Sequence, residues 1–423
     1  MIQVDNLILG SGIAGLGAAH ALRKRGERSL ILEKDATYGG LCGNFEIDGF
    51  RFDRFVHFSF TANPEVRAIF DGSAKEVIKH VPNPYNIYHR QWIKHPAQNN
   101  LFPLPQVEKE ELIDGFLHRK SADTSIHNYE EWLRVQYGDA FAKRFPMVYT
   151  KKYWMHVAKD LRTEWVGQRM YQPSVEEVIA GSKTAETPLT YYTKEMRYPA
   201  KGGYKAYLCE LGEKADVHYN AEVKSIDPKN KIVVAGGERY QYDRLISSIP
   251  LPELLKCIAD VPEDVKEACD QLECTSGYHI SVALKSRNIP PYLWWYIYDE
   301  DILAARVYSP SLKSSDNVPE GCSSLQMEVY CKENEYTEQE LMERTVGKII
   351  EMGLIKKEDI LFTHIGFEKY ANVIFTEPIY RARMIVRDWL SEHGIKTIGR
   401  FGEWDYLWSD QSLLSGLKIV DKL

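Results

Sequence analysis

The feature that most constrains this chain is a glycine turn between an apolar run and a helical pattern. Residues 4–9 are largely apolar, the turn reads Gly10-Ser11-Gly12-Ile13-Ala14-Gly15, and alanine and leucine then recur at helical spacing to residue 22. A second short strand is expected over residues 29–32, and it ends on Glu33. A strand, a glycine turn, a helix and a second strand in this order form the βαβ unit that binds dinucleotides.

Each part of this unit has a physical role in holding a pyrophosphate. Gly10 permits the tight turn, Gly12 lets the backbone approach the phosphates, and Gly15 lets the helix pack closely on the strand. The free N–H groups at the start of the helix attract phosphate charge. Glu33 is placed to accept hydrogen bonds from a ribose 2′-OH. The predicted cofactor contacts in the unit are Gly10, Gly12, Ile13, Ala14, Gly15, Glu33 and Lys34.

A second glycine segment indicates which dinucleotide is bound. Tyr38-Gly39-Gly40-Leu41-Cys42-Gly43 follows the ribose acid closely, where a second stretch of backbone can pass against a cofactor. The doublet resembles the extension found in FAD-binding oxidases and adds Gly40 and Leu41 to the predicted contacts. Taken alone it could equally be a surface turn. After a complete βαβ unit, it predicts FAD.

Composition excludes several classes of function. The net charge of −7 gives no sign of a nucleic-acid partner or an anionic membrane. The 7 cysteines are scattered without CxxC pairs or neighbouring histidines, which argues against a disulfide framework and a metal site. The first strand begins near Met1, and no apolar run approaches the roughly 18 residues of a membrane span. We therefore expect a cytoplasmic protein.

The order of the remaining patterns predicts a site built from distant parts of the chain. Residues 45–60 alternate as a hairpin around Asp48-Gly49, with His57 in the second arm, and the stretch from 65 to 196 is mostly helical by pattern. Strands recur from 279 to 330, and residues 396–402 run from a strand into glycines, with a helix from about Asp410. The first and last segments both look like parts of one nucleotide site.

We predict an α/β fold with a discontinuous Rossmann-type FAD-binding domain, a helical insertion and an antiparallel-sheet substrate domain. The FAD-binding parts are expected at residues 1–65, 197–255 and 385–423. The helical region is expected at 66–196 and the antiparallel sheet at 256–384. The active site would lie between these parts.

Four segments together resemble the UDP-galactopyranose mutases. They are the glycine doublet after the βαβ unit, His95-Pro96-Ala97-Gln98-Asn99-Asn100-Leu101, Glu164-Trp165-Val166-Gly167-Gln168-Arg169 and Gly399-Arg400-Phe401-Gly402-Glu403-Trp404-Asp405-Tyr406. The resemblance spans most of the chain and is closer to the eukaryotic branch. A broader similarity to protoporphyrinogen oxidases and amine oxidases covers the glycine motifs and the strand that ends at Pro250.

The resemblance implies a site in which reduced FAD acts through N5 as a nucleophile on the anomeric carbon of a nucleotide sugar. Arg169 and Arg306 match the family's diphosphate-binding arginines, although most arginines are surface groups. Tyr370 and Tyr406 match tyrosines near the phosphates, and Gln98 and Trp154 match positions that contact uracil; packing is the alternative for each aromatic residue. The implied catalytic residues are Arg169, Arg306 and His57. Further implied cofactor contacts are Val223, Gly399, Arg400, Tyr406, Asp410, Gln411 and Ser412.

Two positions depart from the family pattern. Relatives carry Gly-Gly-His after the aspartate of the hairpin, whereas this chain has Phe55-Val56-His57 after Asp53-Arg54. Phenylalanine and valine resist backbone conformations that glycine permits, so the loop against the flavin is expected to behave differently. The family's tyrosine beside Gln98 is His95 here, which indicates a changed or repositioned nucleotide.

Three functional hypotheses follow. The first is a mutase acting on a nucleotide sugar for surface polysaccharide, supplied with electrons by an external reductant such as NAD(P)H. The second is an FAD-dependent oxidase or dehydrogenase of the protoporphyrinogen oxidase or amine oxidase type, which tolerates the missing Gly-Gly but does not explain the segments at 98–100 and 165–169. The third is a binding protein without catalysis. The sequence does not indicate the sugar, the nucleotide or the oligomeric state.

Overall fold

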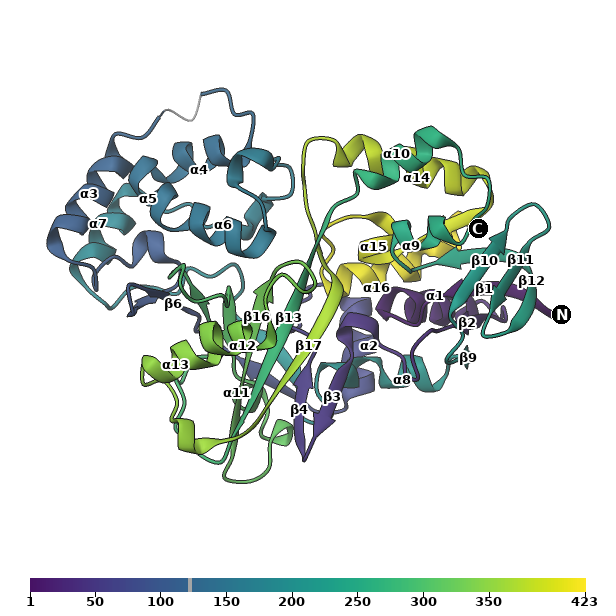
Figure 1. Cartoon of the computed structure of the whole chain (residues 1–423), viewed down its shortest axis with the longest axis horizontal. Coiled ribbons are helices and arrows are strands. Elements are labelled where there is room, and N and C mark those ends of the chain that lie inside the picture. The colour runs from purple at the N-terminus through teal and green to yellow at the C-terminus, as the bar shows by residue number, and fades with distance from the viewer. Residues whose placement is uncertain (121–123) are drawn as a thin grey trace.

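The structure is a computed structural model that describes residues 1–120 and 124–423 (Figure 1). Its first sheet has seven strands in the order β10-β11-β12-β1-β2-β9, with β18 also paired to β12. Strands β9, β2, β1, β12 and β18 run parallel, while β10 and β11 add an antiparallel edge. The bounds are β1 Ile2–Leu9, β2 Leu30–Leu32, β9 Val217–His218, β10 Val223–Asp227, β11 Ile232–Ala235, β12 Glu238–Ser247 and β18 Ile395–Thr397.

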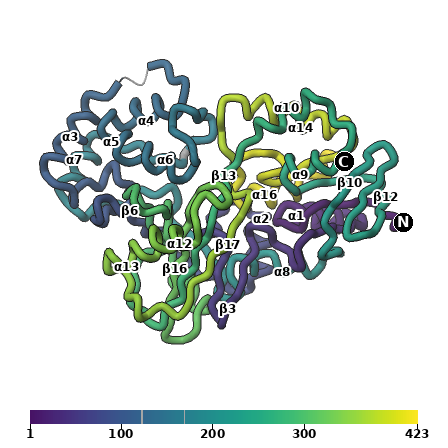
Figure 2. Tube along the Cα trace, viewed as in Figure 1, coloured from purple at the N-terminus to yellow at the C-terminus, as the bar shows by residue number. Residues whose placement is uncertain are grey.

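Segments from both ends of the chain meet on this sheet. Helix α1 (Ile13–Lys24) packs against α16 (Ser409–Leu417), and Figure 2 shows the N-terminal and C-terminal parts of the trace side by side. The contact is close, because a Cβ added at Gly416 would lie 2.0 Å from the carbonyl oxygen of Ala14. The helix expected from about Asp410 is present as α16. It packs on the βαβ unit although it comes from the other end of the sequence.

The second sheet also has seven strands, in the order β17-β13-β16-β15-β14-β6-β7. All neighbours are antiparallel except β14 and β6. The bounds are β6 Tyr85–Tyr88, β7 Gln91–Lys94, β13 Cys274–Leu284, β14 Trp294–Ile297, β15 Arg306–Tyr308, β16 Ser323–Tyr330 and β17 Ile360–Val373. Two of these strands come from the stretch that we expected to be mostly helical. They are short and flanked by prolines, so their pattern is weak without the sheet they join.

The predicted hairpin ends earlier than the sequence suggested. Strands β3 (Asn44–Ile47) and β4 (Phe50–Asp53) are joined by Asp48 and Gly49, whose positive φ angles of 49° and 80° suit a tight hairpin turn. The pairing stops at Asp53, so His57 lies in a loop and not in the second arm. The loop leaves the strand direction at Phe55, where φ is 62°.

The helical part forms a separate lobe at the upper left of Figure 1. Its α7 starts with a capping box, in which Ser174 and Glu177 bond each other's backbone N–H. The α7 helix lies very close to the segment Ala97–Asn99, since a Cβ at Gly181 would be 1.8 Å from the Asn99 carbonyl oxygen. The lobe consists of α3 Gln106–Leu117, α4 Tyr129–Tyr137, α5 Asp139–Arg144, α6 Pro146–Trp154 and α7 Val175–Lys183.

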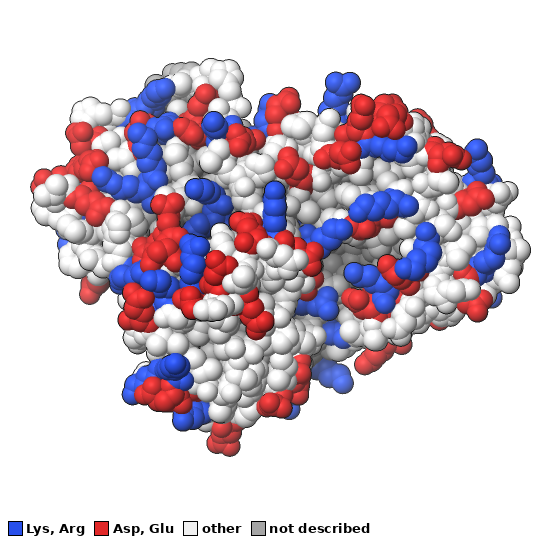
Figure 3. Space-filling model, in the orientation of Figure 1, with Lys and Arg blue, Asp and Glu red and all other residues white. Residues whose placement is uncertain are grey.

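The remaining elements cover the two sheets. They are α2 Pro64–Ala74, β5 Val77–His80, β8 Met196–Pro199, α8 Cys209–Glu213, α9 Leu251–Lys256, α10 Glu263–Asp270, α11 Pro310–Lys313, α12 Glu338–Met342, α13 Lys348–Glu351, α14 Ile379–Glu392 and α15 Gly399–Glu403. None of the helices within 1–120 and 124–423 is long and apolar enough to cross a membrane. On the face shown in Figure 3, basic and acidic side chains are interspersed without a large patch of either sign.

Candidate active site

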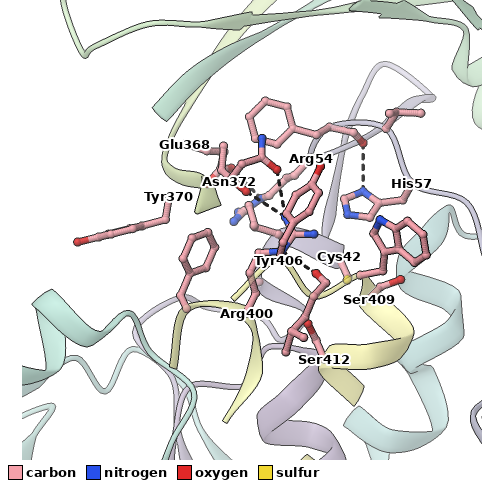
Figure 4. Close-up of a pocket in the computed structure, with 18 of the residues that line it drawn as sticks. Cys42, Arg54, His57, Glu368, Tyr370, Asn372, Arg400, Tyr406, Ser409 and Ser412 are labelled. Carbon is pink, nitrogen blue, oxygen red and sulfur yellow. Dashed lines mark hydrogen bonds and ion pairs between the residues drawn. The ribbon is translucent and has the colours of Figure 1, made fainter. Parts of the chain in front are cut away.

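A single cavity of about 890 Å³ connects the glycine turn to the helical lobe. Its walls come from the first sheet, the loop after β4, the second sheet, the helical lobe and the C-terminal helices. Figure 4 shows the part of the cavity around Arg400, Tyr406 and His57. The volume lies near the upper end of the range for small-molecule sites.

The glycine turn has the geometry that a pyrophosphate requires. Gly10 has a φ of 90°, and a Cβ at Gly15 would lie 2.0 Å from the Gly10 carbonyl oxygen, so both positions need glycine. The space beside Gly12 is open, and no side chain caps the first turn of α1. The second glycine segment passes directly against the turn, because Gly39 donates its N–H to the Ser11 carbonyl at 3.0 Å. This backbone cradle fits the phosphates of a flavin dinucleotide.

Glu33 is held rigidly at the edge of the cavity. Its Oε2 accepts hydrogen bonds from the backbone N–H and the hydroxyl of Ser11, both at 2.7 Å, and Oε1 accepts one from the N–H of Asp35 at 2.9 Å. Lys34 and Val223 line the same part of the cavity. A carboxylate has about four acceptor positions, so Oε1 can still receive a ribose hydroxyl.

The C-terminal segment supplies another wall of the cavity. Gly399 has a φ of 77°, and a Cβ there would lie 2.7 Å from that of Ala14. Arg400 donates to the carbonyl oxygens of Leu407 at 2.8 Å and Ala371 at 3.0 Å, which ties this wall to β17 (Figure 4). The cavity is also lined by Ile13, Gly40, Leu41, Asp410 and Ser412.

Two of the predicted cofactor positions do not line the cavity. Gly15 lies behind the turn, where it permits the close packing described above. Gln411 is exposed, and its Oε1 accepts a hydrogen bond from the N–H of Trp408 at 2.9 Å, so it caps α16.

The loop after β4 is fixed by a buried ion pair. Asp53 and Lys313 have side chains that are 1% and 0% exposed, and Lys313 Nζ lies 2.5 Å from Asp53 Oδ2. Asp53 also accepts hydrogen bonds from the hydroxyl of Tyr198 at 2.7 Å and the N–H of Tyr204 at 3.0 Å. A carboxylate with several donors of this kind holds the start of the loop in one position.

Phe55 adopts the left-handed conformation that glycine adopts without strain. The strain is offset by packing, because the ring is 7% exposed and stacks on Tyr330 at 5.8 Å between ring centroids. The Phe55 carbonyl oxygen accepts a hydrogen bond from Tyr308 at 3.0 Å, and the Val56 N–H donates to Glu328 at 2.8 Å. The loop therefore keeps a glycine-like turn despite the substitution of both glycines.

His57 faces the cavity from this loop. Its Nδ1 lies 3.2 Å from the Phe55 carbonyl oxygen (Figure 4), and its ring packs on that of Tyr204 at 4.9 Å between ring centroids. Burial lowers the pKa of His57 to about 4. The imidazole is therefore neutral at neutral pH, with Nδ1 as the donor and Nε2 as an acceptor.

The two arginines proposed for the substrate line the same cavity. Arg169 donates to the carbonyl oxygens of Trp165 at 2.7 Å and Tyr406 at 3.2 Å, and its guanidinium lies 4.6 Å above the Tyr406 ring. Its buried Nε has no hydrogen-bond partner among the described residues. Arg306 lies in β15, and its Nη2 is 2.6 Å from Glu328, which is 0% exposed. One edge of Arg306 is thus neutralised by a buried carboxylate.

A pair of tyrosines joins the two arginines. The hydroxyls of Tyr153 and Tyr406 are 3.3 Å apart, Arg169 lies over the Tyr406 ring, and Arg306 lies 5.9 Å from the Tyr153 ring centroid. Cations stack favourably on such ring faces. Arg169, Arg306 and Tyr406, which the sequence singled out separately, are therefore brought into one cluster.

Phenol side chains form most of this end of the cavity, and no sequence motif pointed to most of them. They are Tyr149, Tyr153, Tyr191, Tyr192, Tyr296, Tyr330 and Tyr406. Burial raises the pKa of Tyr149 well above its usual range, so its hydroxyl stays protonated. This hydroxyl has no hydrogen-bond partner among the described residues. An unpaired buried hydroxyl in a cavity is suited to bind a polar ligand.

Three further residues predicted to bind the substrate, Tyr370, Trp154 and Gln98, also line the cavity. Tyr370 donates its hydroxyl to Glu253 at 2.5 Å, and Figure 4 shows it pointing away from the group around Arg400 and Tyr406. Trp154 packs edge-to-face on Trp165 at 4.8 Å and on Tyr406 at 5.3 Å between ring centroids, so it adjoins the cluster of the two arginines and Tyr406. Gln98 lines the cavity, and its Nε2 donates to the Tyr171 carbonyl at 2.8 Å.

Comparison with known proteins agrees with this architecture. The family described as flavin containing amine oxidoreductase matches residues 13–346. The chain belongs to this family. FAD is accordingly the cofactor, and the protein is an FAD-dependent enzyme.

The fold is that of a solved reduced UDP-galactopyranose mutase, with a TM-score of 0.93 and 24% identity over 99% of this chain and 95% of that one. Curated relatives have other names. The all-trans-retinol 13,14-reductase of Rattus norvegicus is 41% identical over 13% of this chain and 9% of its own length. The phytoene desaturase of Fusarium fujikuroi is 25% identical over 59% of this chain and 50% of its own length. The chain thus spans half or less of the curated relatives it matches.

The described residues contain no group of three or more His, Cys, Asp or Glu side chains that could hold a metal ion.

Proposed function

We propose that this enzyme is a mutase that interconverts the pyranose and furanose forms of a nucleotide sugar in surface polysaccharide biosynthesis. The observation that carries the proposal is the cluster of Arg169, Arg306 and phenol hydroxyls in the cavity that also contains the dinucleotide cradle. A hydrocarbon polyene has no group for these donors to bind. A sugar diphosphate has many acceptor oxygens and negative charge.

In this proposal the protein supplies positive charge for the diphosphate, hydrogen-bond donors that orient the substrate, and an enclosing cavity. Arg169 and the free edge of Arg306 stabilise the charge that develops on the departing diphosphate, and the planar guanidinium suits phosphate oxygens. Tyr149, Tyr153 and Tyr406 donate hydrogen bonds to the substrate. Burial raises the pKa of Tyr149 and Tyr153 well above the usual range, which keeps these two phenols protonated. Reduced FAD supplies the nucleophile for the anomeric carbon. An external reductant such as NAD(P)H keeps the cofactor in that form.

A second candidate is an oxidase or dehydrogenase. Glu328 favours it, because this fully buried carboxylate cancels much of the positive charge that Arg306 would offer to a diphosphate. Phe55 and Val56 also favour it, since they replace the glycines of the mutase loop. In this case the cavity would bind a less charged substrate, and FAD would accept a hydride from that substrate.

The test is anaerobic incubation of the FAD-bound protein, reduced or oxidised, with UDP-, dTDP- and GDP-hexopyranoses. We expect a furanose product from the reduced enzyme alone. Arg169→Ala should abolish turnover and leave the flavin absorbance unchanged, whereas Lys266→Met, which alters an exposed surface pair, should leave both unchanged. If one of these nucleotide sugars instead bleached the oxidised flavin and no furanose formed, the enzyme would be a dehydrogenase.

A further inference from the structure

Strand β17 carries a bulge where it passes the cavity. Between the paired residues Glu368–Gly277 and Asn372–Thr275, β17 has three residues where β13 has one. A bulge bends its strand and re-aims side chains that would otherwise alternate between the two faces of the sheet. All five residues of β17 from 368 to 372 line the cavity.

Glu253 of α9 ties the bulge to the first sheet. Its Oε1 accepts hydrogen bonds from the hydroxyl of Tyr370 at 2.5 Å and from Nζ of Lys369 at 2.6 Å. Desolvation alone would raise the pKa of the Glu253 carboxyl, but the donors Lys369, Tyr370 and Lys256 lower it to about 2. The carboxylate is therefore charged at neutral pH. Because α9 follows β12 in the chain, this contact joins the two sheets.

Arg54 makes a second tie, at the residue that precedes the bulge. Its Nε lies 3.4 Å from Oε1 of Glu368 (Figure 4), and its Nη1 lies 4.0 Å from Oδ2 of Asp35, which follows β2. The Glu368 side chain is 19% exposed, so solvent screens this pair less than an open surface pair. No sequence motif pointed to Arg54.

The two ties lie at the mouth of the cavity. Their side chains line the cavity and are also between 19% and 60% exposed; they are Arg54, Glu253, Glu368 and Lys369.

Both ties adjoin residues that the sequence predicts to contact the dinucleotide. Asp35 donates its N–H to Oε1 of Glu33 at 2.9 Å. On the other side, Sγ of Cys257 donates to the carbonyl oxygens of Val223 at 3.5 Å and Glu253 at 3.3 Å. The bulge is therefore held on both flanks next to the predicted dinucleotide contacts.

We propose that the bulge of β17, held by Glu253 and Arg54, is a clasp that controls the entry and release of FAD. The inference requires FAD as the cofactor but does not depend on the identity of the substrate. Partly exposed polar contacts open locally at a much lower free energy than the buried core, so these ties are suited to a gate. The clasp also explains Tyr370, whose hydroxyl is occupied by Glu253 and not directed toward Arg400.

The experiment follows flavin fluorescence after a jump in FAD concentration, starting from the FAD-bound protein. The dependence of the observed rate on FAD concentration gives the uptake rate as the slope and the release rate as the intercept. Glu253→Gln should speed both rates roughly tenfold, and Arg54→Gln should speed both by a smaller factor. Glu263→Gln makes the same change in an exposed pair with Lys266 and should alter neither rate.

The uptake rate distinguishes a clasp from a direct contact with the cofactor. Opening a clasp lowers the barrier in both directions, whereas loss of a contact to FAD speeds release alone. Unchanged rates in both variants, or faster release without faster uptake, would overturn the proposal.

A salt series tests the wild-type protein, so the result does not depend on the folding of a variant. Higher ionic strength screens the ties and should speed both uptake and release. Uptake that slows or stays constant as salt is added would contradict the clasp, because screening of a simple attraction between the protein and the FAD phosphates does not speed uptake.

Discussion

Replacement of Lys313 by methionine should destabilise the FAD-bound protein strongly, because it removes one partner of a buried ion pair. Lys313 Nζ makes its hydrogen bond to Asp53 at 2.5 Å, and both side chains are almost fully enclosed. Leaving a buried charge without its partner costs about 3–5 kcal/mol. Tyr198 and Tyr204 still donate to Asp53 and keep the expected cost near the lower end.

This cost converts to a shift in the melting temperature. The entropy of unfolding at the midpoint is about 2.1 cal/mol/K per residue, which gives about 0.9 kcal/mol/K for a chain of this length. Lys313→Met should therefore lower Tm by about 3–5 °C. The assay follows release of flavin fluorescence on heating at fixed FAD and protein concentrations, because ligand binding also shifts Tm.

A double-mutant cycle identifies the cause. Asp53→Asn leaves an amide oxygen that can still accept hydrogen bonds, and combined with Lys313→Met it removes both charges. The loss of Tm in the double variant should be about 2 °C smaller than the sum of the losses in the two single variants. Lys266→Met removes an exposed pair with Glu263 and should change Tm by less than about 1 °C. Additive losses in the Asp53 and Lys313 variants would refute the claim that the pair acts as a unit.

The other predictions concern charge, proton uptake and the unpaired phenol. Arg169→Lys should retain FAD but lose most of its activity, because an ammonium cannot replace a planar guanidinium stacked on rings; unchanged kcat/KM would contradict this. The hydrogen bond that His156 donates to the Glu273 carboxylate raises the pKa of His156, so His156→Gln should cost stability at about pH 5.5, and the cost should disappear as pH rises above about 7. A Tm difference that is independent of pH would disprove that coupling. Tyr149→Phe should leave Tm unchanged or higher, since its hydroxyl is unpaired, but should weaken substrate binding, and calorimetry measures both effects.

The sequence was most informative where contacts are local. The glycine turn, the helix after it and Glu33 lie within one supersecondary unit, so their spacing alone indicated the cradle, and the structure has the expected close contacts at Gly10 and Gly15. The hairpin was predicted with its turn but extended too far, because the strand ends at a tertiary anchor. Asp53 is held by Lys313, and that contact joins residues far apart in the chain.

The sequence by itself determined the cofactor and the class of fold, because a dinucleotide is bound mainly by backbone geometry that glycine positions encode directly. Tertiary structure alone decided the chemistry around Arg306 and His95. The register of β15 and β16 places Arg306 opposite Glu328 and neutralises one edge of the arginine. The pairing of β6 and β7 brings Oδ1 of Asn86 to 3.0 Å from Nδ1 of His95. Such pairings depend on which strands meet and in which register, and no local pattern specifies either.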